Sequence, residues 1–308
     1  MFKNQNQKLL LGAHVSISGG LKNSIARAES IGCNVMQIFS KSNRQWAAKP
    51  IEEYEANLFK EALKKSNIEF AVVHASYLIN ASASMGDIYN KSMSSLIEEL
   101  QRCQQLNIPY LVLHPGSNAN CAEGQKNIAA NINQVFEKVP GNSMILLENM
   151  AGMGNCIGKT FEQLARIIDS IRDKNRIGIC FDTCHAFAGG YNFNTSDSYE
   201  NMWKLFDNTI GLNFLKAMHI NDSKSDCGSQ IDRHAHIGQG KIDINGFQML
   251  FNDSRFFGIP KILETPIEND EKDFIPDIKK IVNLISSDNQ SLLSNTSFGQ
   301  YLTDAHKN

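Results

Sequence analysis

The sequence lacks the features that mark membrane and disulfide-rich proteins. No apolar stretch approaches membrane-spanning length, and the N-terminal run of three leucines is too short for the core of a signal peptide. The seven cysteines are odd in number and include no C-x-x-C pair, which favours a reducing compartment over a disulfide framework. These absences predict a cytoplasmic protein that has no membrane partner.

The sequence also lacks an excess of charge of either sign. A formal net charge of -2 excludes a globally basic nucleic-acid binder, although a local patch on a neutral protein can still bind phosphates. The first predicted turn carries no G-x-G-x-x-G phosphate motif, which argues against an open dinucleotide-binding sheet. With 308 residues, 42% of them hydrophobic, the chain is long enough for two ordinary domains or one large α/β barrel.

Eight short apolar runs predict buried strands, and amphipathic segments between them predict helices. The apolar runs span residues 9–16, 35–40, 70–76, 110–117, 144–150, 177–185, 214–222 and 261–266. The clearest amphipathic segments span residues 52–66, 93–106, 129–139, 161–173 and 273–286. Alternation of this kind predicts a single (β/α)8 TIM barrel over residues 1–287. The polar tail, residues 288–308, is expected to be poorly ordered or loosely docked.

Most of the predicted strands end in a histidine or a carboxylate. The residues at these ends are His74, His114, Glu148, Asp182 with His185, His219 and Glu264, and the loop after the seventh strand adds Asp232 and His234. The C-terminal ends of barrel strands meet at one rim, so these side chains should converge there. Crowded carboxylates need compensating charge, and a mixture of imidazole with carboxylate suits zinc or manganese. His14 also ends a strand and is either a hydrogen-bonding partner of a ligand or a structural residue.

Eight segments, in order over residues 10 to 266, resemble the endonuclease IV family of apurinic/apyrimidinic (AP) endonucleases. The segments are GAHVS, VHASYLIN, LVLHPGS, LLENMAGMG, CFDTCHAFAGGY, MHINDSK, DRHAHIGQG and ILET. The resemblance implies a (β/α)8 barrel that holds three zinc ions and cuts DNA on the 5′ side of abasic sites. The departures from the family pattern, Met150, Met153 and Gln239, fall at no ligand position.

The resemblance also assigns the ligands and their roles. His74, His114 and a bridging Glu148 would hold the first metal, Glu148 with Asp182, His219 and Glu264 the second, and His185, Asp232 and His234 the third. A hydroxide between the first two ions would attack the phosphorus, with Glu148 as the catalytic residue that positions it. The products would be a 3′-OH and a 5′-deoxyribose phosphate, and the enzyme would also trim 3′-blocking groups.

Two loops at the same rim are predicted to contact double-stranded DNA that contains abasic sites or 3′-blocked ends. The loop after the second strand carries Lys41, Arg44 and Lys49 without one acid, and Arg44 with Gln45 resembles the groove-inserting pair of the family. Tyr77 and Leu78 are expected to form an apolar wedge beyond the metal ligands. No partner subunit is predicted, so we expect a monomer.

Two other functions compete with this interpretation. A divalent-metal sugar isomerase or epimerase on the same barrel would need only about four ligands, which leaves several of the predicted set without a role. A non-catalytic module that binds damaged DNA would have no use for a metal site with open coordination positions. Metal stoichiometry separates the first alternative from the prediction, and turnover of an abasic duplex separates the second.

Overall fold

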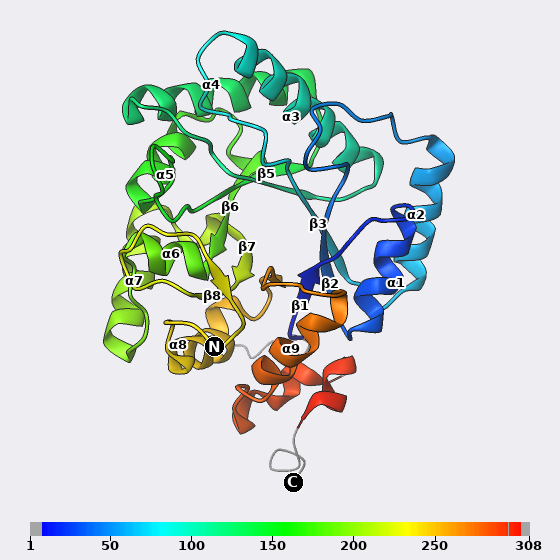
Figure 1. Cartoon of the computed structure of the whole chain (residues 1–308), viewed down its shortest axis with the longest axis vertical. Coiled ribbons are helices and arrows are strands. Elements are labelled where there is room, and N and C mark those ends of the chain that lie inside the picture. The colour runs from blue at the N-terminus through cyan, green and yellow to red at the C-terminus, as the bar shows by residue number, and fades with distance from the viewer. Residues whose placement is uncertain (1–7, 295, 303–308) are drawn as a thin grey trace.

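Eight parallel strands close into a barrel in the computed structural model, which describes residues 8–294 and 296–302 (Figure 1). The barrel strands are β1 (Leu11–His14), β2 (Val35–Phe39), β3 (Phe70–His74), β4 (Tyr110–Leu113), β5 (Met144–Glu148), β6 (Ile177–Asp182), β7 (Leu215–Ile220) and β10 (Lys261–Leu263). Neighbouring strands pair in sequence order, and β10 closes the ring between β7 and β1. The prediction of a (β/α)8 barrel is confirmed.

Helices surround the barrel on the outside of the strands (Figure 1). They are α1 (Lys22–Ser30), α2 (Glu53–Lys65), α3 (Asp87–Gln105), α4 (Cys121–Lys138), α5 (Phe161–Ser170), α6 (Thr183–Gly189), α7 (Ser196–Thr209), α8 (Ile244–Asn252) and α9 (Ile275–Val282). The helix predicted over 129–139 begins earlier, because the Asn120 side chain caps α4 by accepting a hydrogen bond from the Glu123 N–H. None of the helices that the structure describes combines the length and hydrophobicity needed to cross a membrane.

The interior of the barrel is built in layers, and this layering places the polar side chains. One apolar layer takes a residue from seven of the strands: Val35, Val72, Val112, Leu146, Cys180, Ala217 and Ile262. Side chains two residues apart on a strand face the same side, so the residue two positions later also faces the interior, closer to the C-terminal rim. Those residues are Gln37, His74, His114, Glu148, Asp182, His219 and Glu264. The register therefore stacks a polar layer on an apolar one.

The predicted loose tail is in fact packed against the barrel over its described residues. Two 3-10 helices, Ser287–Leu293 and Ser297–Tyr301, form there. Phe298 is fully buried, and the backbone carbonyl of Leu292 accepts a hydrogen bond from Leu9 N at 2.8 Å. The expectation of a loosely docked tail is wrong for these residues, because scattered apolar side chains within a polar stretch anchor it. Residues 295 and 303–308 lie outside the described part.

Candidate metal centre and DNA-facing loops

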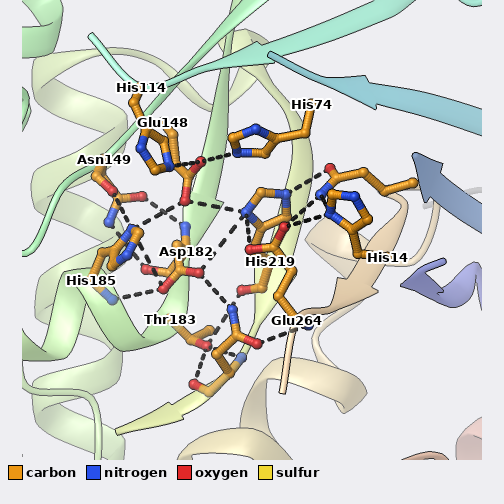
Figure 2. Close-up of polar contacts among 12 residues, drawn as sticks. His14, His74, His114, Glu148, Asn149, Asp182, Thr183, His185, His219 and Glu264 are labelled. Atoms are coloured by element: carbon orange, nitrogen blue, oxygen red, sulfur yellow. Dashed lines mark hydrogen bonds and ion pairs between the residues drawn. The ribbon is translucent and has the colours of Figure 1, made fainter. Parts of the chain in front are cut away.

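Glu148, at the end of β5, lies among four imidazole rings from four other parts of the barrel (Figure 2). Its side chain is fully buried. Glu148 Oε2 lies 3.3 Å from His74 Nε2 and 3.2 Å from His114 Nε2. Glu148 Oε1 lies 3.1 Å from His185 Nδ1 and 3.2 Å from His219 Nδ1. A single carboxylate thus contacts residues that lie up to 74 positions away from it in the sequence.

Two further carboxylates complete a second group around His219. Glu264 Oε2 lies 3.2 Å and Asp182 Oδ2 lies 3.9 Å from His219 Nδ1. Asp182 also caps α6, because its Oδ1 accepts a hydrogen bond from His185 N at 2.7 Å. Asp182 can therefore cap α6 and belong to the cluster at the same time, because the two contacts use different carboxylate oxygens.

A third group is formed where the loop after β7 folds back over the rim. Strand β8 (Asp222–Ser223) pairs antiparallel with β9 (His234–Ala235), and this pairing returns the chain to the site. Asp232 Oδ2 then lies 3.2 Å from His185 Nε2, and its Oδ1 lies 3.4 Å from His234 Nε2.

These contacts bring together the residues of each of the three ligand sets expected from the sequence, and their role as metal ligands stays a prediction. In each set the candidate ligand atoms lie within 4.8 Å of one another. The sets are His74, His114 and Glu148; Glu148, Asp182, His219 and Glu264; and His185, Asp232 and His234. The Cys184 thiol also approaches Asp182 and His234, but burial raises its pKa to about 12, which keeps it protonated. Cys184 is therefore best described as a small buried residue.

The histidines are oriented so that one ring nitrogen faces the cluster. The Nδ1–H groups of His74, His185 and His234 each donate to a backbone carbonyl, at 2.8, 3.0 and 3.0 Å. A carbonyl only accepts, so Nδ1 carries the proton and the neutral ring presents the Nε2 lone pair to the carboxylates. Nε2 of His185 and of His234 is buried without a hydrogen-bond partner among the described residues. This is the orientation that metal-ligating histidines adopt.

The electrostatics of the cluster call for cations. Burial by itself raises the pKa of Glu148, but the nearby charges of His219 and His114 outweigh it and hold this pKa well below its usual range. Burial lowers the pKa of His185, but Asp182 and other carboxylates raise it well above its usual value. The negative charge must therefore be balanced by protons on imidazole or by metal ions. The Nε2 lone pairs of His185 and His234, which face Asp232 oxygens at 3.2 and 3.4 Å, fit metal ions.

The predicted wedge lies directly against this cluster. The Tyr77 side chain is 56% exposed, and Leu78 is half-buried. The Tyr77 ring centroid lies 5.5 Å from that of His74 and 5.6 Å from that of His114. The Tyr77 ring therefore lies directly over two of the candidate ligands, because the loop turns back immediately after β3. Its role as a wedge stays a prediction.

The basic patch on the loop after β2 contains fewer exposed cations than predicted. Lys41 is buried, and its Nζ donates to Trp46 O at 2.8 Å and lies 3.2 Å from Glu98 Oε2. An acidic partner on α3 thus neutralises it, which removes Lys41 from the predicted patch. Arg44 and Lys49 are exposed, and no ion pair to either side chain forms within residues 8–294 and 296–302. These two cations remain available to phosphate.

Gln45 is exposed next to Arg44, as expected of a pair that reaches outward. The loop that carries the pair is joined to the loop of Tyr77, because Ser76 Oγ donates to Asn43 O at 2.8 Å. The two predicted DNA-contacting loops therefore lie side by side on the rim.

Sequence reasoning missed three amides that support the ligands. Asn221 Nδ2 donates to Asp182 Oδ2 at 2.7 Å, and the Asn149 side chain bonds both the N–H and the carbonyl of Asp182. Gln37 contacts His219 and lies in the polar layer of the barrel. A signal was present for Gln37, since it follows the apolar layer residue of its strand by two positions, as the ligands do.

Comparisons with known proteins agree with this geometry. The family model described as "Xylose isomerase-like TIM barrel" matches residues 25–284. A Chloroflexus aurantiacus protein named "Probable endonuclease 4" is 48% identical over 83% of this chain and 90% of its own length, and an apurinic-apyrimidinic endonuclease of Caenorhabditis elegans is 45% identical over 83% and 66%. The crystal structure of endonuclease IV from Thermus thermophilus is similar with a TM-score of 0.76 and 31% identity, covering 87% of this chain and 96% of that one. The chain therefore belongs to the endonuclease IV family, on a xylose isomerase-like TIM barrel.

Proposed function

We propose that this member of the endonuclease IV family hydrolyses the phosphodiester bond on the 5′ side of abasic sites in double-stranded DNA. The products are a 3′-OH and a 5′-deoxyribose phosphate, and the same site removes 3′-blocking groups. The observation that carries the proposal is the set of three ligand groups at one rim, two of which share the buried Glu148. The adjoining loops offer exposed cations and an aromatic side chain to the DNA.

Three zinc ions fit the three groups of candidate ligands, with manganese as the alternative at each. Imidazole and carboxylate donors suit both metals, and the ring nitrogens that face the cluster are the donors that such ions need. When bound, closely spaced zinc ions activate water and neutralise charge on the phosphate and on the departing 3′ oxygen. Glu148 would hold an ion of the first group and an ion of the second, since it is common to both candidate ligand sets.

The chain itself orients the ligands and binds the substrate. Backbone carbonyls hold the Nδ1–H groups of three histidines, which keeps their Nε2 atoms directed at the cluster. Arg44 and Gln45 would enter the DNA groove and contact the backbone. Tyr77 and Leu78 would fill the space left when the abasic nucleotide leaves the stack, which excludes water from the region next to His74.

A sugar isomerase or epimerase on the same barrel is the competing function. It requires about four ligands around one or two ions, whereas nine candidate ligands converge here. Exposed Arg44 and Tyr77 beside the site also suit a large anionic polymer better than a small sugar. Monomeric state and cytoplasmic location stay predictions.

Metal analysis combined with a cleavage assay tests the proposal. The purified chain is expected to carry two to three equivalents of zinc and to cut a duplex with one abasic site at its 5′ side. The same duplex without the abasic site is the matched control and should stay intact. Prolonged chelation should abolish cleavage, and zinc should restore it. Full activity in a metal-free preparation, or no cleavage by the fully loaded protein, would overturn the proposal.

A further inference from the structure

Gln37 is a buried amide inside the polar layer of the barrel. It lies on β2, and its side chain is fully excluded from solvent. Three polar side chains surround it. Gln37 Nε2 lies 2.6 Å from Glu264 Oε1 and 2.9 Å from His14 Nδ1, and Gln37 Oε1 lies 2.8 Å from His219 Nε2. Every polar atom of this side chain is therefore engaged.

The contact with Glu264 fixes which way the amide faces. An ionised carboxylate only accepts hydrogen bonds, so the amide nitrogen must face Glu264 and donate to it. The amide oxygen consequently faces His219 and can only accept. His219 Nε2 must then be the nitrogen that carries the proton.

Protonation of His219 at Nε2 has a consequence on the other side of the ring. The neutral imidazole then presents its Nδ1 lone pair to the carboxylates of the second ligand group. His74, His185 and His234 face their groups with Nε2, because a backbone carbonyl holds their Nδ1–H. His219 uses the opposite nitrogen, and a side chain takes the place of that carbonyl.

We propose that Gln37 is a positioning residue that sets the tautomer of His219 and restrains the Glu264 carboxylate, and so prepares the second metal group. The inference rests on the proposed function, because it assigns a metal to this group. Gln37 binds neither metal nor DNA itself. Its side-chain amide contacts the side chains of two candidate ligands, Glu264 and His219, at once.

The test compares Gln37→Met with a matched control. Methionine keeps the length of the side chain and removes the amide, and Gln125→Met makes the same change at a buried position on α4, where the amide contacts Cys121. Zinc affinity of the full chain is measured by competition with a chelator. Loss of a partner of this kind costs about 10- to 100-fold in metal affinity. We expect one zinc equivalent to weaken by that factor in Gln37→Met, and Gln125→Met to retain the affinity of the parent.

A second measurement separates positioning from general damage to the fold. Nitrogen NMR of histidine-labelled, zinc-free chain is recorded at a pH above the raised pKa of His219, so that this ring is neutral. It should show the Nε2–H tautomer of His219 in the parent and in Gln37→Glu, which keeps an acceptor oxygen. Gln37→Met should lose that preference. Parental zinc affinity together with a parental tautomer in Gln37→Met would overturn the inference.

The result also distinguishes this inference from the proposed function. If the parent cuts abasic DNA and Gln37→Met binds zinc as the parent does, the role of Gln37 falls and the function stands. If Gln37→Met loses zinc and the tautomer changes, but the loaded parent does not cut abasic DNA, the function falls and the role of Gln37 stands.

Discussion

Replacing Glu148 with glutamine removes one negative charge from the centre of the site and changes almost nothing in volume. The carboxylate lies within 3.1–3.3 Å of four imidazole nitrogens and is fully buried. An amide at this position turns an N–H2 group toward two of those nitrogens and leaves one weaker oxygen ligand. Both candidate ligand groups that share Glu148 are therefore altered by a single substitution.

The rate of cleavage should fall much more than the affinity for DNA. Loss of one charge-stabilising group commonly costs about 100- to 1,000-fold, or about 2.7–4 kcal/mol of activation free energy. A ligand common to two groups should lie at the upper end of that range. Binding should survive, because Arg44 and Tyr77 belong to the loops after β2 and β3 and do not depend on β5. The barrel should also fold, because Glu148 lies above the apolar layer and not within it.

Single-turnover cleavage of an abasic duplex under saturating enzyme measures the chemical step, and fluorescence anisotropy follows binding separately. Glu69→Gln is the control, since it removes a carboxylate that precedes β3 and pairs with Lys8 at 2.8 Å, at the opposite end of the strand. It should leave the rate unchanged. A purely structural Glu148 is already disfavoured as a cap of α5, because Thr160 fills that role. A Glu148→Gln rate within about threefold of the parent would refute the bridging role.

The double substitution Tyr77→Ala with Leu78→Ala should weaken binding to abasic duplex by about 1–3 kcal/mol, the size of an aromatic stacking contact. If the double variant binds with the affinity of the parent, both are ordinary surface residues. Arg44→Ala should lower the salt slope of binding by about 0.9 if it neutralises one phosphate, and an unchanged slope would rule out that contact. Lys41→Met should lower the free energy of unfolding by about 3–5 kcal/mol in a denaturant titration, because the buried Glu99 and the half-buried Glu98 lose their cation. A parental midpoint would contradict this. Burial lowers the pKa of Lys261 to about 7, while the unfolded value is about 10.4, so the unfolded chain binds more protons between these values. The stability of the parent relative to Lys261→Met should therefore rise from pH 7 to pH 10, and a difference that does not vary with pH would contradict the shift.

The strands and the candidate ligands could be predicted because both depend on local sequence. A short apolar run followed at once by His74 or Glu148 specifies a buried strand and a polar rim in one stretch of chain. Parallel closure then brings the ends together without any detail of packing. The loop residues Asp232 and His234 were predicted for the same reason, since the loop that carries them leaves the rim at β7.

Lys41 could not be placed from the sequence, because its environment is set by residues far along the chain. Its partner Glu98 is 57 residues away on α3, and only the packing of that helix against the loop brings the two charges together. Gln37 was missed for a different reason. An uncharged amide within an apolar run is marked only by its position two residues after Val35 and not by its residue type. Its role depends on contacts with His219 and Glu264, which are 182 and 227 residues away.

The register of the strands explains why the polar layer lies where it does. One position before its polar-layer residue, a strand directs a side chain at the surrounding helices. Two positions before that residue, the side chain lies in the closed apolar layer, as Val72 and Leu146 do. A carboxylate at either place would be buried away from any compensating cation, at a cost of several kcal/mol. At the rim, Glu148, Asp182 and Glu264 fall in one candidate ligand group and can share a cation. The seven strands that carry Gln37 and the six candidate ligands need no change in backbone geometry to present them. A one-residue slip of a single strand would move its ligand to the outer face, so the pairing of strands determines the composition of the site as directly as the residues do.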